Sequence, residues 1–434
     1  MKKVLINLLV IVGMTVSVAT RADEPLRIVI EDGIENALPI AIVPFGWSQA
    51  SSVAPLDLSA IISQDLSRSG RFDVMPEQDL PQRPTSYDSI NFGDWRKLGM
   101  ENILIGNMAL TAGGDYDISF RLVDVYRQQQ IAGFRIPARP NMLRRVAHQI
   151  SDIIFEKLTG IPGAFDTRVA YVTVRKQANG KLYSLQIADA DGANAQILLE
   201  SSEPLLSPAW SPDGRRIAYV SFEGKNSAIY VQDVVSGRRD KLAGFPGINS
   251  APAFSPDGQN LAMTLSKDGN TEIYIMNLAS RQLRRMTRNP AIDTEPTWSP
   301  DGKKLAFTSD RGGAPQIYEI GINGGEPQRL TFQGSYNARA DYSPDGRQIA
   351  LVHGNSGSYR IGLLNIATGY IDILTTARLD ESPSFAPNGG MIIYATQGSD
   401  GGRLAAVSTD GTIQQRLGDE AVEVREPAWG PFLK

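Results

Sequence analysis

Short apolar runs separated by turns fill the chain from residue 169 onward. Each run is about four residues long and rich in β-branched and aromatic side chains, as at 217–220, 272–275 and 305–308. Runs of this kind, bounded by Gly, Pro and Asp, predict strands rather than helices. Each unit contains three such runs, and a run that ends in an aromatic residue then opens the next unit. The pattern therefore predicts four short strands per unit.

A four-residue turn punctuates these units at a regular interval. Ser-Pro-Asp-Gly begins at Ser211 and recurs three times at intervals of 44 residues, and Ala-Pro-Asn-Gly follows at Ala386 after a further 43. Pro suits the second position of a type I turn, and Gly supplies the left-handed backbone at the end. The aromatic residues before the turns, and one more near the chain end, are Trp210, Phe254, Trp298, Tyr342, Phe385 and Trp429. Four strands per 44 residues is typical of a β-propeller blade.

Six runs of the first type after the turn predict six blades. They begin at Val169, Ile217, Leu261, Leu305, Ile349 and Ile392. No aromatic-ended strand precedes the first run, but the segment 427–431 is such a strand with nothing after it. We therefore expect the strand that carries Trp429 to pair beside 169–172 and to close the ring. Closure removes the free sheet edges that promote aggregation.

Residues before the propeller follow a different pattern. Strands are expected at 38–45, 102–110, 116–125 and 129–136. Asp57 can cap a helix, and 141–159 is the clearest helix because an apolar stripe runs along it and Gly160 ends it. The sequence thus predicts an N-terminal α/β domain, followed by an all-β six-bladed β-propeller. The expected domain bounds are 23–161 and 162–434, with a linker at 161–167 so short that the domains touch.

The first residues predict export. Lys2 and Lys3 precede an apolar stretch at 4–18, and a small-residue cleavage site follows. We expect residues 1–22 to be a signal peptide that is cleaved after about Ala22. The stretch is shorter than the roughly 20 residues that span a bilayer. The mature protein is therefore expected in a bacterial periplasm, with no transmembrane segment.

Composition limits the chemistry. The chain has no Cys, two His and a net charge of -4, which excludes thiol catalysis, disulfides and multi-histidine metal sites and argues against nucleic-acid binding. We expect His148 to be polar surface or a satisfied contact, 354–357 beside His353 to be a hairpin turn, and 189–192 to be a plain turn rather than a calcium loop. No catalytic residue, cofactor or metal ligand is assigned.

Two regions remain as candidates for binding. The loops that join each outer strand to the next inner strand should gather around one mouth of the propeller, and they carry mixed apolar and charged residues. The segment 23–33 can form a strand that adds to the edge of another sheet, or it can be the first strand of its own domain. A metal enzyme of lactonase type stays open as an alternative, because Glu295, Asp341, Glu381 and Glu426 could converge on the axis.

The chain resembles the TolB family, the periplasmic component of the Tol-Pal system. The resemblance rests on the signal segment, Arg-Ile-Val-Ile at 27–30, the segment 39–45, Glu-Lys-Leu-Thr-Gly at 156–160 and the six-fold repeat, and it spans the mature chain. It implies a non-enzymatic, monomeric adaptor for outer-membrane integrity and invagination during cell division. It further implies that the lipoprotein Pal binds at the propeller mouth and TolA binds the N-terminal tail, 23–34.

The resemblance and the loop positions give the expected binding residues. By the resemblance, the Pal-binding loops include Ile248, Asn249, Thr294 and Glu295, and the other mouth loops add Asn337, Arg339, Glu381 and Arg425. Ile248 departs from the histidine that relatives carry, which affects the polar contact there rather than the surface. The expected TolA-binding residues are Leu26, Arg27, Ile28, Val29 and Ile30. A propeller that binds peptidoglycan or sugar stays open as a second alternative.

Overall fold

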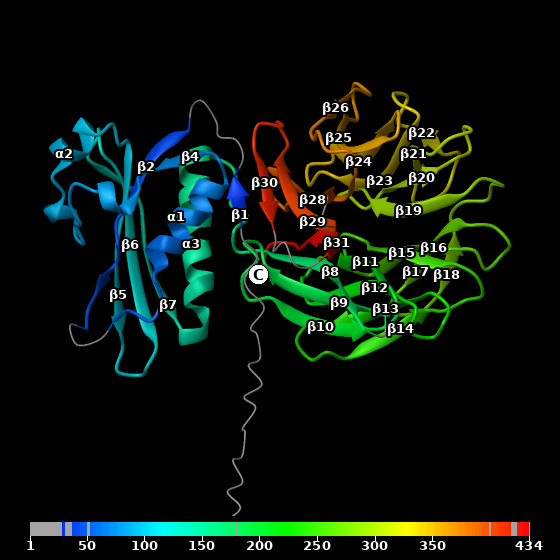
Figure 1. Ribbon diagram of the computed structural model, residues 1–434, viewed down its shortest axis with the longest axis horizontal. Helices are drawn as coiled ribbons and strands as arrows, with labels where there is room; N and C mark the ends of the chain where they lie inside the picture. The colour runs from blue at the N-terminus through cyan, green and yellow to red at the C-terminus, as the bar shows by residue number, and fades with distance from the viewer. Residues whose placement is uncertain are drawn as a thin grey trace, which may run out of the picture.

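The chain forms two domains that lie side by side (Figure 1). The computed structural model describes residues 28–30, 37–49, 53–178, 180–398, 401–417 and 423–433. The expected signal peptide, 1–22, lies outside these residues. No helix in the described ranges is long and apolar enough to cross a membrane.

The N-terminal domain is built on one mixed sheet. Its strands are β2 (Leu38–Ile42), β3 (Gly46–Trp47), β4 (Phe72–Val74), β5 (Asn102–Leu110), β6 (Tyr116–Asp124) and β7 (Gln129–Ala138). The order is β4-β2-β5-β6-β7, with β3 also paired to β5. Strand β2 runs parallel to β4 and β5, whereas β5, β6 and β7 form an antiparallel meander.

Helices cover both faces of this sheet because its strands alternate apolar residues to either side. Helices α1 (Leu58–Arg68) and α3 (Leu143–Thr159) pack on one face, against a core that includes Ile40 and Leu104. The short α2 (Phe92–Lys97) places Trp95 on the other face, against the neighbouring residues Ala41 and Ile103. The sheet is therefore buried on both sides, and α3 faces the propeller (Figure 1).

The helix ends match the capping residues in the sequence. The Asp57 side chain accepts a hydrogen bond from the Ala60 N–H at 3.0 Å, and Gly160 ends α3 with a φ of +76°. Helix α3 begins two residues later than expected because Pro140–Met142 forms a separate 3-10 turn. Two further 3-10 turns, Glu77–Asp79 and Tyr87–Ser89, lie in the connection between β4 and α2.

Six antiparallel blades of four strands each form the propeller, and one further strand from outside the propeller extends the sixth. The first combines β8 (Arg168–Gln177), β9 (Gly180–Asp189) and β10 (Gln196–Ser201) with the last strand, β31 (Glu423–Trp429). The second and third are β11 (Leu205–Trp210), β12 (Arg216–Ser221), β13 (Ala228–Asp233), β14 (Arg239–Ala243), and β15 (Asn249–Phe254), β16 (Asn260–Leu265), β17 (Glu272–Asn277), β18 (Leu283–Arg285).

The remaining three blades follow the same plan. The fourth is β19 (Asp293–Trp298), β20 (Lys304–Ser309), β21 (Gln316–Gly321) and β22 (Gln328–Arg329). The fifth is β23 (Tyr336–Tyr342), β24 (Gln348–Asn355), β25 (Ser358–Asn365) and β26 (Ile371–Ile373). The sixth is β27 (Asp380–Phe385), β28 (Met391–Gly398), β29 (Gly401–Ser408) and β30 (Gln414–Leu417).

The ring closes as the repeat predicts. Trp429 of β31 lies opposite Val169 of β8, and Ala428 lies opposite Ala170. The aromatic residues tie neighbouring blades together, since Trp210 Nε1 donates to the Ala428 carbonyl at 3.1 Å. The predicted count of six blades and the predicted closure are confirmed.

Each inner strand contains one residue with a left-handed backbone. These residues are Ser207, Ala251, Glu295, Arg339, Ser382 and Glu426, and their φ angles lie between +46° and +56°. At each of them the register with the second strand of the blade shifts. Such a bulge re-aims side chains, and all six residues line the central channel.

Candidate binding sites

Buried polar residues occupy the first or second position of the inner strands of four consecutive blades. They are Asn249, Asp293, Asn337 and Asp380, each with 0% exposure. Asn249 Oδ1 accepts a hydrogen bond from the Phe245 N–H at 2.9 Å, and its Nδ2 donates to the Phe245 carbonyl at 2.7 Å. A side chain at the start of the strand therefore fixes the loop that leads into it.

This burial revises the role expected for two of the mouth residues. Asn337 Nδ2 donates to Gln316 Oε1 at 2.8 Å and to the Gln333 carbonyl at 2.7 Å, and its Oδ1 lies 2.9 Å from His353 Nδ1. Asn249 is held in the same way. Neither side chain reaches the surface, so each positions the mouth instead of contacting a partner.

The residues just before these buried groups are the ones that the mouth presents. Ile248 and Ile292 are 47% and 51% exposed, and Tyr336, in the equivalent position of the next blade, is partly exposed. Phe332, in the loop that leads to Tyr336, is 69% exposed. Ile292 and Tyr336 were not among the residues expected at the mouth, although the 44-residue spacing from Ile248 points to both.

The other expected mouth residues differ in exposure. Arg425 is exposed and pairs with Glu423 on its own strand, and Glu381 is partly exposed. Thr294 is partly exposed, and its hydroxyl lies 3.4 Å from the Thr264 hydroxyl. These residues surround the apolar ones with polar groups.

Arg339 lies across the channel behind the mouth. Its Nη2 lies 2.7 Å from Glu426 Oε2 and its Nε lies 3.2 Å from Glu295 Oε1. The guanidinium also donates to the Ser382 hydroxyl, and Nη2 lies 3.5 Å from Ser207 Oγ. One side chain thereby connects the inner strands of five blades.

The electrostatics of this cluster favour the charged form of the arginine. Burial lowers the pKa of Arg339, but the charges of Glu426 and Glu295 outweigh it, so the pKa lies above its usual value. A further hydrogen bond holds Glu295 in the cluster, because its Oε2 accepts a hydrogen bond from Thr308 Oγ1 at 2.9 Å. Two of the four axial carboxylates that a lactonase-like metal would need, Glu295 and Glu426, are therefore already paired with a guanidinium.

Behind this cluster the channel widens into a cavity of about 470 Å³ lined by the inner strands. Asp341 lies among these lining residues, and one of its carboxylate oxygens accepts a hydrogen bond from the Phe385 N–H at 2.8 Å. Burial raises the pKa of Asp341 to about 6, although this hydrogen bond opposes the rise.

The tail pairs with the propeller. Strand β1 (Ile28–Ile30) runs antiparallel to β30, with Ile28 opposite Leu417 and Ile30 opposite Gln415. The sixth blade thereby gains a fifth strand. Of the two roles left open, addition to the edge of another sheet is confirmed, and membership of the sheet of its own domain is wrong. Leu26 and Arg27 lie outside the described residues.

The segment 354–357 beside His353 contains a turn. Ser356 and Gly357 connect β24 to β25 with φ angles of +52° and +81°. The hairpin predicted there is confirmed, and the neighbouring His353 is bonded to Asn337.

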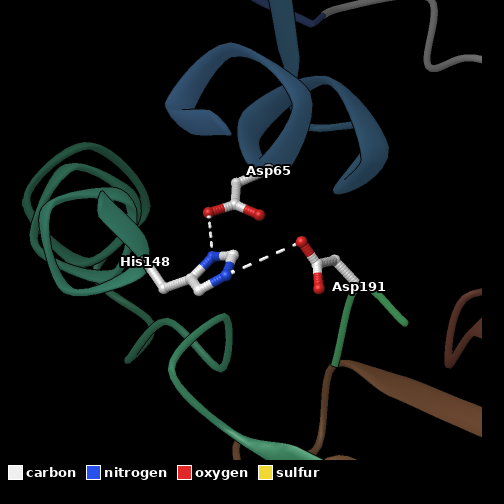
Figure 2. A group of neighbouring side chains, drawn as sticks. All are labelled: Asp65, His148 and Asp191. Carbon is white, nitrogen blue, oxygen red and sulfur yellow. Dashed lines mark hydrogen bonds and ion pairs between the residues drawn. The ribbon is translucent and has the colours of Figure 1, made fainter. Parts of the chain in front are cut away.

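His148 occupies a place that the sequence did not indicate. It lies on α3 with 2% exposure, so the expectation of a surface residue is wrong, and the expectation of a satisfied contact holds for Nδ1 but, among the described residues, not for Nε2. Its Nδ1 lies 2.7 Å from Asp65 Oδ2 of α1, and its Nε2 faces Asp191 Oδ2 of the propeller at 3.6 Å (Figure 2). Asp191 belongs to the plain turn predicted at 189–192, where the Gly192 N–H donates to the Asp189 carbonyl at 2.8 Å.

Known proteins resemble this chain over nearly its whole length. Residues 26–131 match the family model described as the TolB amino-terminal domain, and residues 155–433 match the TolB beta propeller domain. The Tol-Pal system protein TolB of Thioalkalivibrio sulfidiphilus is 60% identical over 413 residues, which is 95% of either chain. The protein of the same name from Nitrosococcus oceani is 61% identical over 407 residues, covering 94% of this chain and 93% of its own.

A solved structure agrees with the fold. The crystal structure of TolB from Acinetobacter baumannii aligns with a TM-score of 0.86 at 45% identity. The alignment covers 94% of this chain and 100% of that one.

Proposed function

The chain belongs to the TolB family of periplasmic Tol-Pal components, and on that premise we propose that it is a non-enzymatic adaptor that binds Pal at the propeller mouth and TolA through its N-terminal tail. It acts as a monomer in outer-membrane integrity and in invagination of the envelope during division. The main support for the proposed Pal site is the row of exposed apolar side chains that three consecutive blades present at the mouth.

Three features of the mouth support a protein partner. Ile248, Ile292 and Tyr336 form an apolar centre, and Arg425 and Glu381 add charge at other loops of the ring. An apolar centre with a polar rim is the usual anatomy of a protein interface. The loops are rigid because buried polar side chains hold them, so little conformational entropy is lost when a partner binds.

The ion pairs in the channel favour binding over catalysis. Arg339 pairs with Glu295 and Glu426 directly behind the mouth. One guanidinium is shared by two carboxylates there, so these charged groups are already bound to one another. The pairing joins blades of the ring and so supports a structural role for these residues.

The pairing of the tail with β30 supports the proposed TolA site. Strand β1 has only three residues and its described pairing is a backbone ladder to β30. A ladder of backbone hydrogen bonds can exchange one sheet edge for another, which is how peptides are recognised by β-strand addition. The same segment can therefore lie on the propeller or on a partner.

Ile292→Arg tests the Pal site. A charge at the centre of an apolar interface should weaken Pal binding by at least about tenfold, as measured by isothermal titration calorimetry with the soluble domain of Pal. Val235→Arg is the matched control, since Val235 is 91% exposed and lies in the turn between β13 and β14. Equal affinity of the two variants would reject the mouth as the Pal site.

A further inference from the structure

The two domains meet where α1 and α3 lie against the first and sixth blades. Arg71 Nη2 lies 3.0 Å from Asp410 Oδ2, and Asn388 Nδ2 donates to the Pro162 carbonyl at 2.9 Å. These contacts are at the solvent-exposed margin, where ion pairs contribute little. The buried part of the contact includes His148, which lies between Asp65 and Asp191.

His148 bridges the domains through both ring nitrogens. Nδ1 lies 2.7 Å from Asp65 Oδ2 in the N-terminal domain, and Nε2 faces Asp191 Oδ2 of the first blade at 3.6 Å (Figure 2). Asp65 and His148 are 1% and 2% exposed. Among the described residues, nothing forms a hydrogen bond with His148 Nε2.

The charged side chains around His148 carry one more negative charge than positive charge. From α1, Asp65 pairs with Arg68 at 3.0 Å. Arg144 of α3 pairs with Asp191, and its Nε lies 3.9 Å from Asp189 Oδ2. Three carboxylates thus face two guanidinium groups.

A proton on His148 supplies the missing charge. In the neutral ring, Nδ1–H donates to Asp65 and the Nε2 lone pair faces the negative Asp191 carboxylate. In the protonated ring, Nε2–H faces that carboxylate, and a buried unsatisfied atom becomes half of an ion pair. Burial alone lowers the pKa of His148, but the hydrogen bond and charge of Asp65 and the charge of Asp191 outweigh it, so the pKa is raised.

A metal ion fits the cluster less well than a proton. These three side chains have the residue types and spacing of a metal site. However, the Asp191 oxygen that faces His148 is the one that Arg144 binds, and Arg68 binds Asp65. A divalent cation would have to displace guanidinium groups or lie beside them, whereas a proton leaves both pairs intact.

The cluster is connected to the strand that holds the tail. The carbonyl oxygen of Arg68 accepts a hydrogen bond from Gln415 Nε2 of β30. Gln415 lies opposite Ile30 of β1 in the ladder. The position of α1 relative to the propeller is therefore coupled to the edge on which the tail lies.

We propose that His148 is a proton-operated latch that fastens the N-terminal domain to the propeller and, through Arg68 and β30, steadies the docked tail. The domain latch stands on its own, whereas its effect on TolA rests on the proposed function of the tail. Asp65 belongs to the same domain as His148 and stays on Nδ1 when the domains separate, so attachment adds the charge of Asp191, which raises the pKa of His148. The latch is therefore closed below the pKa that His148 has in the detached state, and it opens as the pH rises through the higher pKa of the attached state.

Asp152 is a second titratable group on α3 that must be separated from His148, and burial also raises the pKa of Asp189 beside Arg144. It is buried on α3 and accepts hydrogen bonds from the Phe165 and Asp166 N–H groups of the linker. Burial raises the pKa of Asp152 to about 7, although those hydrogen bonds oppose the rise. Asp152→Asn removes this titration and is therefore the matched control for His148→Gln.

The distance between the domains tests the latch in the full-length mature protein. The chain has no cysteine, so spin labels at the exposed positions Glu101→Cys and Gln196→Cys report the distance by double electron-electron resonance. Between about pH 5.5 and 8.5 the detached population should increase, by about tenfold for each unit of pKa difference between attached and detached states. His148→Gln should abolish the response, and Asp152→Asn should retain it.

Three results would overturn the latch. They are a distance distribution that ignores pH in the natural sequence, an unchanged pH response in His148→Gln, and a response to Zn²⁺ or a chelator in place of pH. If His148→Gln does not fold, Asp191→Asn is the alternative variant. It removes the carboxylate that faces His148 from the propeller, and it should abolish the pH dependence of the distance in the same way. None of these measurements requires TolA, so the failure of the tail as a TolA site would leave them intact.

Hydrogen exchange of the β30 backbone tests the link to the tail. Exchange at 414–417 should accelerate at high pH beyond the intrinsic rate change, in the natural sequence but not in His148→Gln. Equal protection in both proteins across this pH range would show that His148 is not coupled to the strand that holds the tail.

Discussion

Arg339 and Glu426 meet across the propeller axis, with Nη2 of the arginine 2.7 Å from Oε2 of the glutamate. The two residues belong to the fifth and first blades. Because the same guanidinium also binds Glu295 of the fourth blade, it connects strands that the sequence places far apart.

Arg339→Met should destabilise the propeller. It leaves Glu295 and Glu426 without their cation in a partly desolvated channel, at an expected cost of about 1–3 kcal/mol in the free energy of unfolding. Urea denaturation followed by tryptophan fluorescence measures this change. Arg238→Met, at an exposed turn, is the control, and equal stability of the two variants would contradict the role given to Arg339.

Gly70→Ala should loosen the contact between the domains. Gly70 has a φ of +65°, and a Cβ there would lie 2.4 Å from Ile413 Cδ1 of the propeller. Gly99→Ala is the control, since Gly99 has a φ of +73° and nothing within 4 Å of such a Cβ. Both variants carry backbone strain of about 1 kcal/mol, and Gly70→Ala should lose about 1–3 kcal/mol more through overpacking. Thermal unfolding of both variants makes the comparison, and equal losses would argue against tight packing of α1 on the sixth blade.

Asp341→Asn should change how stability depends on pH. The pKa of the Asp341 carboxyl is raised to about 6 in the folded protein, so its contribution to stability is complete below its ordinary pKa near 3.9 and is lost as the pH rises through about 6. The variant should therefore lose less stability than the natural sequence between these values. Urea titrations at a series of pH values test this, and parallel curves would mean that Asp341 is ionised throughout.

Deletion of 23–32 should separate the two proposed partners. The backbone of 28–30 pairs only with β30 among the described strands, and the mouth belongs to the loops of the propeller. Binding of TolA should be lost, and affinity for Pal should stay within about threefold, as measured by calorimetry with each purified partner. Loss of both activities in a folded protein would reject this division of labour.

Local patterns in the sequence determined the architecture. The 44-residue spacing, the turn residues and the unpaired strand at 427–431 predicted six blades and their closure, since a turn or a strand depends mostly on its own residues. The cap at Asp57 and the stop at Gly160 are likewise local, and both are observed.

Tertiary structure decided which mouth residues can meet a partner. Asn249 and Asn337 are polar and lie at the expected loops, yet both are fully buried and hold the chain in place. The neighbouring Ile248 is apolar and exposed. Residue type alone could not make this distinction, because a buried amide with every hydrogen bond satisfied resembles a surface amide in the sequence.

The sequence by itself therefore determined the number, order and closure of the blades, the α/β domain before them and the elements that carry the two candidate binding regions. Only the tertiary structure placed β1 on β30, Arg339 among the carboxylates of other blades, and His148 between Asp65 and Asp191. The physical reason is distance along the chain: these contacts join residues far apart in sequence, so they depend on how whole blades and domains pack, which no local pattern of polar and apolar residues records.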